Sequence, residues 1–332
     1  MTHLADREIL AALEARLGRT HARQRLGIET EHEARVFGNG RNFFHPENWY
    51  GLPRIIGGSL TLVGMRGRAH RNTTRIVVRT NEVALAHLPP AFHGFTLLQI
   101  SDLHVDMNDR VAGDIAGVVR GLDYDLCVLT GDFRASTAGP IEPTLDGMRR
   151  IRTVLKESIL GVLGNHDSVR MLPALEAMGM RLLMNESIAI ERDGTTIHVA
   201  GVDDAHYYRV DNIDKAASAI DADRVSILLS HTPEIYRQAA HAGFDVMLSG
   251  HTHGGQICLP GGVPVFLDAK LPRRYGRGAW RHQGMQGYTS AGAGTSILDA
   301  RLNCPPEVTL HRLVRGTPSA APQGSGPPRT AT

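Results

Sequence analysis

Cysteine and aromatic residues are scarce in this chain. It has 3 cysteines among 332 residues, far apart and with no C-x-x-C pair. The sequence therefore supports neither a disulfide framework nor a thiolate zinc site, and it is typical of a reducing compartment. Phe, Trp and Tyr make up 5% of the residues, which leaves little surface for stacking on single-stranded bases. Because the formal charge of +2 is too small for a global field that attracts DNA, we expect no nucleic-acid partner.

The sequence also predicts no segment that would export the chain or span a membrane. The first residues show no basic region followed by an apolar one, so no secretory signal is predicted. Residues 246–267 hold no Asp, Glu, Lys or Arg, yet their glycines, prolines and histidines are typical of a loop. With 42% hydrophobic and 21% charged residues, the chain is predicted to be a folded protein. The sparse cysteines and the lack of a predicted signal favour a location in the cytoplasm.

Apolar periodicity divides the chain into three parts. Residues 1–73 are predicted to form a helical and basic preface, because apolar residues such as Leu13 and Leu17 recur at helical spacing. Residues 74–315 alternate strand-like and helix-like runs and then acquire hairpin character, which predicts a mixed α/β domain with a largely parallel region. Residues 316–332 are dominated by Pro, Gly, Ser, Ala and Thr and are predicted to be disordered.

Five strand-like runs each end in polar residues of metal-binding type. Because ligands of an open α/β sheet bind beyond the carboxyl ends of its strands, these side chains are expected to converge. The five endings are Ser101-Asp102-Leu103-His104, Thr130-Gly131-Asp132, Gly164-Asn165-His166-Asp167, Ser230-His231 and Ser249-Gly250-His251-Thr252-His253. Glycines immediately before three of these groups permit the sharp turns that such a site needs.

The residue types in these endings suit one kind of metal chemistry. Carboxylates, imidazoles and an amide oxygen without thiolate favour Mn, Fe, Zn, Co or Ni, and we expect manganese in particular. Seven such groups exceed what one tetrahedral ion needs. Two divalent ions about 3.5–4 Å apart that share a bridging carboxylate use them all, and this arrangement serves phosphoryl hydrolysis. Each ending alone is compatible with a polar turn, but five in succession, each after an apolar strand, favour the metal site.

The same residues resemble the calcineurin-like metallophosphoesterases. Asp102-x-His104, Gly131-Asp132, Gly164-Asn165-His166-Asp167, His231 and Gly250-His251-x-His253 match the five motifs of that superfamily. The run Leu-Leu-Gln-Ile-Ser-Asp-Leu-His, the Ser-His-Thr-Pro-Glu from Ser230 and Asn303-Cys-Pro-Pro-Glu are similar to a bacterial branch. That branch includes small phosphodiesterases and enzymes that cleave the pyrophosphate of UDP-diacylglucosamine. The resemblance covers residues 74–314 and implies a four-layer β-sandwich flanked by helices.

The resemblance also implies a division of roles. One metal ion would be held by Asp102, His104, Asp132 and His253, and the other by Asp132, Asn165, His231 and His251, with Asp132 bridging. His166 would face the phosphoryl group and assist the leaving group, with Asp167 orienting it.

The predicted reaction is hydrolysis of a phosphodiester or pyrophosphate by a hydroxide that bridges the two metal ions. The substrate would be a small-molecule, nucleotide-linked or lipid-linked phosphate ester, such as UDP-diacylglucosamine. The alternative is an inactive phosphoesterase fold that binds a protein partner, as in the retromer subunit of this superfamily. Such scaffolds lose metal ligands, whereas all of them are present here.

Two weaker candidates lie in the second half of the chain. Asp203-Asp204-x-His206 follows a strand and either lines the substrate side of the site or forms a turn. The basic cluster of Arg273, Arg274 and Arg277 either meets a second phosphate or a nucleotide, or is a solvated loop.

Residues 50–81 have an unusual charge pattern. They hold six arginines and no Asp or Glu, and the apolar run 55–65 separates the first arginine from the other five. This pattern predicts one of two arrangements. The segment either makes peripheral contact with anionic headgroups at the inner membrane face, or it is a buried strand followed by an Arg-rich solvated loop.

Overall fold

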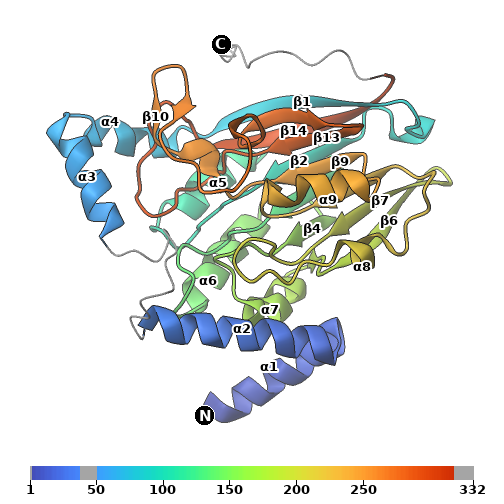
Figure 1. The fold of residues 1–332 in the computed structure, drawn as a ribbon, viewed down its shortest axis with the longest axis horizontal. Helices are drawn as coiled ribbons and strands as arrows, with labels where there is room; N and C mark the ends of the chain where they lie inside the picture. Colours follow the sequence, from blue (N-terminus) through green and yellow to red (C-terminus); the bar gives the residue numbers. More distant parts are fainter. Residues whose placement is uncertain (1, 38–50, 318–332) are drawn as a thin grey trace.

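The computed structural model describes residues 2–37 and 51–317. Two six-stranded sheets pack face to face, and helices cover the outer face of each (Figure 1). The mixed α/β fold, a four-layer β-sandwich flanked by helices, is therefore confirmed.

The first sheet has the strand order β1-β14-β2-β3-β4-β5. Neighbours from β2 to β5 run parallel, β14 is antiparallel to β2, and β1 is parallel to β14. The strands are β1 (Val77–Leu85), β2 (Thr96–Ile100), β3 (Leu126–Thr130), β4 (Ile159–Val162), β5 (Met180–Leu182) and β14 (Glu307–Arg315). Pairing of β1 with β14 joins the first and the last strand of the chain at one edge of this sheet.

The second sheet has the order β12-β13-β9-β8-β7-β6. Its four central strands run parallel, and β12 and β6 are antiparallel edge strands. The strands are β6 (Glu186–Arg192), β7 (Thr195–Gly201), β8 (Ser226–Leu229), β9 (Val246–Ser249), β12 (Gly278–His282) and β13 (Met285–Thr289). A separate two-stranded hairpin consists of β10 (Cys258–Leu259) and β11 (Val263–Pro264).

Helices from distant parts of the chain pack around the two sheets. They are α1 (Thr2–Leu17), α2 (Arg19–Phe37), α3 (Leu52–Leu62), α4 (Arg66–Arg71), α5 (Val111–Val119), α6 (Glu142–Arg152), α7 (Leu172–Ala177), α8 (Ile213–Ala217) and α9 (Tyr236–His241). In the described part of the chain, none of these helices combines the length and the apolarity that crossing a bilayer requires.

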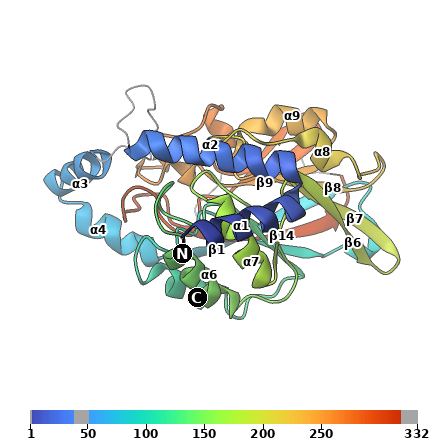
Figure 2. The same ribbon diagram turned by 90° about the horizontal axis from the view of Figure 1, so that it is seen from below.

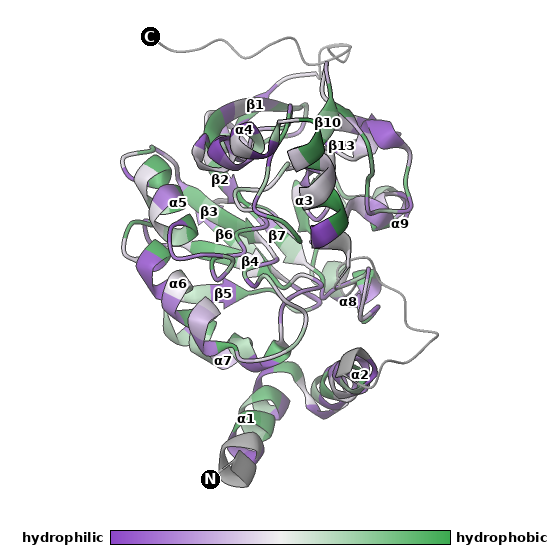
Figure 3. Cartoon of the chain, turned by 90° about the vertical axis from the view of Figure 1, so that its left-hand side faces the viewer, coloured by the Kyte–Doolittle hydropathy of each residue, from purple (hydrophilic) through white to green (hydrophobic). Residues whose placement is uncertain are grey.

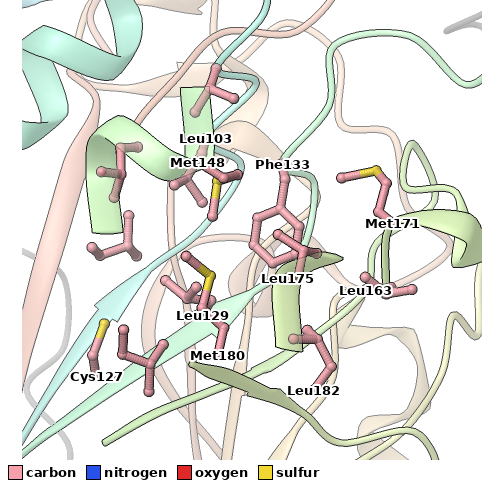
Figure 4. Close-up of a cluster of buried hydrophobic side chains, with 14 of the residues drawn as sticks. Leu103, Cys127, Leu129, Phe133, Met148, Leu163, Met171, Leu175, Met180 and Leu182 are labelled. Atoms are coloured by element: carbon pink, nitrogen blue, oxygen red, sulfur yellow. The ribbon is translucent and has the colours of Figure 1, made fainter. Parts of the chain in front are cut away.

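Apolar side chains fill the space between the two sheets and the space between each sheet and its helices. Between the sheets, Val128 and Leu160 of the first pack with Ile227 and Leu248 of the second. A second layer lies between the first sheet and α5, α6 and α7; Figure 4 shows part of it, with Phe133 among leucine and methionine side chains. Parallel strands buried on both faces explain why the strand sequences are continuously apolar and not alternating.

The two N-terminal helices belong to the body of the protein. Figure 2 shows α1 and α2 side by side across one edge of the sandwich. Leu13, Leu17 and Ala22 are buried in the layer that covers the first sheet, and Gly18, with a φ of 83°, makes the turn between the helices. Residues 2–17 and 19–37 are helical, while the division of the chain at 73 and 315 stays a prediction. The predicted disorder of 316–332 falls almost entirely outside the described residues.

The apolar run 55–65 is not a strand. It forms most of α3, and the arginines that follow begin α4, so the hypothesis of a buried strand and a solvated loop is wrong. Pro53 stands in the first turn of α3, where a proline costs no backbone hydrogen bond. Ile56 and Leu60 are one helical turn apart and pack against Leu298, Ala300 and Leu302. A helix therefore buries one face of this segment.

Candidate metal centre

The five predicted endings meet at one end of the sandwich. Asp102 and His104 follow β2, Asp132 follows β3, Asn165 follows β4, His231 follows β8, and His251 and His253 follow β9. The first three strands belong to one sheet and the last two to the other. All seven side chains are buried. The structure brings together every residue that the sequence predicted as a metal ligand.

Asp132 lies at the centre of this cluster. Its Oδ2 is 3.3 Å from His231 Nε2, 3.7 Å from His104 Nε2 and 3.9 Å from His166 Nε2. Its Oδ1 accepts a hydrogen bond from the backbone N–H of His166 at 3.0 Å. One carboxylate oxygen therefore faces imidazole nitrogens from three different loops.

Asp102, His104 and His253 form one candidate group on one side of Asp132. The Nε2 atoms of His104 and His253 are 3.1 Å apart, and His253 Nε2 is 3.4 Å from Asp102 Oδ1. His104 Nδ1 donates to the carbonyl of Arg134 at 2.6 Å, so in the neutral ring its Nε2 carries a free lone pair. A hydrogen bond of this kind fixes the tautomer that a metal ligand needs.

Asn165, His231 and His251 form a group on the other side. Asn165 Oδ1 lies 2.8 Å from His231 Nε2 and 2.9 Å from His251 Nδ1. His231 Nδ1 donates to the carbonyl of Thr130 at 2.8 Å, so the neutral ring turns a lone pair toward the amide and carboxylate oxygens. Electron-pair donors this close together need a shared proton or a cation between them.

The protonation states favour a cation in these positions. Burial lowers the pKa of His104 to about 3, and burial also holds the pKa values of His251 and His253 well below the ordinary value. These rings are neutral at physiological pH and available as ligands. Burial lowers the pKa of His231, but the carboxylate of Asp132 outweighs it and raises that pKa to about 10. A proton and a metal ion compete for this nitrogen. The residues present therefore fit divalent metal ions.

Most of the candidate ligands have a left-handed backbone conformation. Five of the seven candidate ligands have positive φ angles, namely Asp102 (51°), His104 (42°), Asp132 (56°), His251 (69°) and His253 (49°). Residues other than glycine adopt this region at a cost, and such residues cluster at functional sites. The preceding Gly131 has a φ of 84°, and a Cβ there would lie 2.7 Å from the backbone nitrogen of Gly164. Only glycine lets these two loops approach so closely.

His166 faces the cluster, but Asp167 does not orient it, and this part of the prediction is wrong. The carbonyl of Ala135 accepts from His166 Nδ1 at 2.8 Å. Asp167 instead accepts from backbone N–H groups of Asp132 and Gly164, both at 2.8 Å, and of Phe133 at 2.9 Å. Its carboxylate ties the Asp132 and Asn165 loops together. The local sequence shows that the two residues are adjacent, but it does not show which way each side chain points.

Arg301 supports the metal-binding loop, and the sequence analysis missed it. Its side chain is fully buried and donates to the carbonyl of His253 at 3.0 Å, with another nitrogen 3.1 Å from His253 Nδ1. Arg301 lies two residues before the Asn303-Cys-Pro-Pro-Glu run, so that motif was the available signal.

Arg25 of α2 is a second residue that the sequence analysis missed. It donates to Glu29 Oε2 and to the carbonyl of Asp167, at 2.9 and 2.8 Å, and its Nε lies 3.4 Å from Asp203 Oδ1. Glu29 in turn accepts from the backbone N–H of Val169 at 3.0 Å. The spacing of Arg25 and Glu29 by four residues was the only local signal. Helix α2 therefore holds the segment that directly follows His166.

The weaker candidates have different outcomes. Asp204 accepts from the backbone N–H groups of Tyr207 and Tyr208 at 2.6 and 2.7 Å, which confirms the turn. His206 nevertheless lies at the site, because its ring centroid is 4.2 Å from that of His251 and its Nδ1 donates to Glu234 at 2.8 Å.

The predicted basic cluster is divided between solvent and the metal-binding loop. Arg273 and Arg274 are exposed. Arg277 packs against Gly254, where an added Cβ would lie 2.8 Å from its Cδ.

Comparisons with known proteins agree with this geometry. The family model described as calcineurin-like phosphoesterase matches residues 95–255. The chain is 28% identical over 264 residues to the uncharacterized metallophosphoesterase YkoQ of Bacillus subtilis, covering 76% of this chain and 96% of YkoQ. It is 26% identical over 231 residues to the phosphodiesterase YaeI of Escherichia coli, covering 66% of this chain and 82% of YaeI.

Fold, site and comparisons define a metal-dependent phosphoric ester hydrolase. More particularly, residues 95–255 match the calcineurin-like phosphoesterase family, and the chain is similar over most of its length to a metallophosphoesterase. The family uses divalent metals, and the candidate ligand groups described above are the residues of this chain that suit them.

Proposed function

We propose that the protein hydrolyses a phosphodiester or pyrophosphate with two divalent cations, manganese being favoured. Asp102, His104, Asp132 and His253 would hold one cation, and Asp132, Asn165, His231 and His251 the other. The observation that carries this proposal is the position of Asp132, which shares one candidate group with His104 and His166 and another with His231 and His251. When bound, such a pair of cations activates water and neutralises negative charge on phosphoryl oxygens.

His166 would serve the leaving group. Its Nδ1–H is held by the carbonyl of Ala135, so the ring presents Nε2 to the cluster. In the protonated ring this nitrogen donates a proton or a hydrogen bond to the departing oxygen, which is the role of a general acid or charge stabiliser. Arg25 and Asp167 position the loop that carries His166 without contacting the substrate.

The proposed substrate carries a second group beyond the scissile phosphate. Arg277 borders the metal-binding loop at Gly254, where a guanidinium suits a second phosphate or a nucleotide. A relative named as a phosphodiesterase also favours a diester over a monoester. A lipid-linked pyrophosphate such as UDP-diacylglucosamine has both features.

Two measurements test this proposal. Protein stripped with a chelator is reconstituted with manganese or zinc, and bound metal is measured by elemental analysis. About two equivalents per chain are expected. The manganese form is then assayed on p-nitrophenyl phosphate, bis-p-nitrophenyl phosphate, cyclic nucleotides and UDP-diacylglucosamine. Hydrolysis of the diester or pyrophosphate above the monoester supports the proposal. Absence of both tight metal and turnover would favour the scaffold alternative.

A cytoplasmic location is part of the proposal. Cys127, Cys258 and Cys304 are all buried and free, which agrees with a reducing compartment.

A further inference from the structure

Exposed apolar side chains gather on two elements of this protein. Among the described residues, nine large hydrophobic side chains are exposed, and eight of them lie on α3 and the turn after it or on the β10–β11 hairpin. These eight are Ile55, Leu62, Val63, Met65, Leu259, Val263, Val265 and Phe266. Leu62 is 89% exposed and Phe266 58%. Exposed apolar side chains gathered on neighbouring elements are typical of an interaction surface.

The two elements are fixed side by side. Ile56 and Leu60 of α3 pack with Ile257, which directly precedes β10, and with Leu302. The backbone N–H of Cys258 donates to the carbonyl of Leu302 at 2.9 Å. Figure 3 shows α3 and β10 on the same side of the molecule. We call this surface, formed by residues 52–71 and 257–267, the α3–β10 face.

Helix α3 also carries exposed apolar residues away from the side that packs on the protein. Ile56 and Leu60 face the protein, whereas Ile55 and Leu62, seven residues apart, are exposed. Residues at that spacing lie on one side of a helix. Packing against the protein accounts for Ile56 and Leu60, but it does not account for the exposed Ile55 and Leu62.

Positive charge surrounds these apolar residues. The exposed arginines of the first segment are Arg54, Arg66, Arg68, Arg71 and Arg75, and residues 50–81 contain no acidic residue. Residues 256–290 contain five basic residues and a single acidic one, Asp268. Since the whole chain carries only +2, these two segments are more basic than the rest of the chain.

We propose that the α3–β10 face docks on an anionic phospholipid bilayer. Aliphatic and aromatic tips would enter the boundary between headgroups and acyl chains, and the arginines would remain among the anionic headgroups. The exposed apolar side chains match the acyl-chain boundary of the bilayer, and the surrounding arginines match its anionic headgroups. The same tips with one aromatic side chain offer little for base stacking, which argues against a nucleic acid.

Docking would bring the metal centre close to the membrane. The β10–β11 hairpin begins five residues after His253, and Arg277 lies against Gly254 beside it. A phosphate ester with a lipid anchor would then reach the site without leaving the bilayer. This last step rests on the proposed function, whereas binding to the membrane does not.

Vesicle co-sedimentation tests the proposal with the full chain. Vesicles of phosphatidylcholine alone, or with about a third phosphatidylglycerol, are used at low and high salt. We expect binding to the anionic vesicles that weakens with salt. Arg66→Glu/Arg68→Glu should lower the affinity about tenfold or more, because each basic residue at such a surface contributes separately. Leu259→Ser/Phe266→Ser should weaken binding at both salt concentrations.

Arg149→Glu/Arg150→Glu on α6 is the matched control, because it makes the same charge change at exposed positions away from this face. Melting temperatures and turnover of soluble bis-p-nitrophenyl phosphate should be the same in all variants. Equal loss in the control, or no binding of wild type to anionic vesicles at low salt, would overturn the proposal. So would a wild-type dimer that Leu259→Ser/Phe266→Ser dissociates, since the face would then join two copies of the chain.

Discussion

Replacing Arg25 by methionine tests whether α2 is part of the structural support of the metal centre. The guanidinium is fully buried, and its three hydrogen-bond partners come from α2, from the Asp167 loop and from the turn at Asp203. It also lies 3.3 Å from the centroid of the Tyr208 ring. Methionine keeps an apolar stem of similar volume but leaves Glu29 and Asp203 buried without their shared cation.

The structure sets the magnitude of this effect. Removing one partner of a buried ion pair costs about 3–5 kcal/mol of unfolding free energy, because the remaining charge is uncompensated. That is a large part of the roughly 5–15 kcal/mol that stabilises a typical domain. At about 2 °C per kcal/mol for a large domain, the melting temperature should fall by about 6–10 °C. Turnover should fall as well, since the loop that carries His166 loses its hydrogen bond from α2.

Urea denaturation and scanning calorimetry measure this loss. Arg23→Met is the matched control, because Arg23 lies on the same helix, is 53% exposed and pairs with Glu14 at the surface. An exposed pair contributes about 1 kcal/mol or less. Equal losses in the two variants would refute the proposed support. In Arg25→Met/Glu29→Gln, part of the lost stability should return, because one of the stranded charges is gone.

Three further results are expected. Burial raises the pKa of Asp203, but Arg25 and His21 outweigh it and hold that pKa below its ordinary value. The stabilisation is therefore present above the unfolded pKa of about 3.9 and is lost as pH falls through the folded pKa, so the gap in melting temperature between wild type and Arg25→Met, both in chelator, should narrow below about pH 4. A constant gap from pH 7 to pH 3 would contradict this. Asp132→Asn should weaken both metal ions and abolish hydrolysis, and elemental analysis that finds two tightly held ions with near-normal turnover would disprove the bridging role. His166→Ala should retain the metal content and lower kcat by about 10²–10⁴-fold, whereas metal loss would make His166 a ligand.

Local sequence patterns predicted the elements that carry the metal centre. The five apolar runs that precede the predicted polar endings are the strands β2, β3, β4, β8 and β9. Each is a continuous apolar run followed by a polar group, and a run buried on both faces has that form in any parallel sheet. Within each sheet, the convergence of the ligands followed from one general property, that the carboxyl ends of parallel strands share an edge. That the two sets of ligands meet depends on how the two sheets pack together.

Long-range pairing was less accessible to local patterns. Strand β14 inserts between β1 and β2, although more than 200 residues separate it from both. The hydrophobic pattern within one strand does not show which other strand pairs with it. The apolar run 55–65 was compatible with a strand until the structure showed Leu298, Ala300 and Leu302 as the surface that receives one side of a helix.

The sequence by itself determined the chemistry of this protein, namely the seven oxygen and nitrogen donors, their place after apolar strands and the absence of thiolate ligands. Only the tertiary structure decided which atoms face one another. It assigned Asp167 to backbone N–H groups, Ala135 to His166, Arg301 to His253 and Arg25 to the Asp167 loop. The physical reason is distance along the chain. Periodicity records which residues are buried within one element, whereas a hydrogen bond between residues 142 positions apart, as from Arg25 to Asp167, depends on how all the elements between them pack.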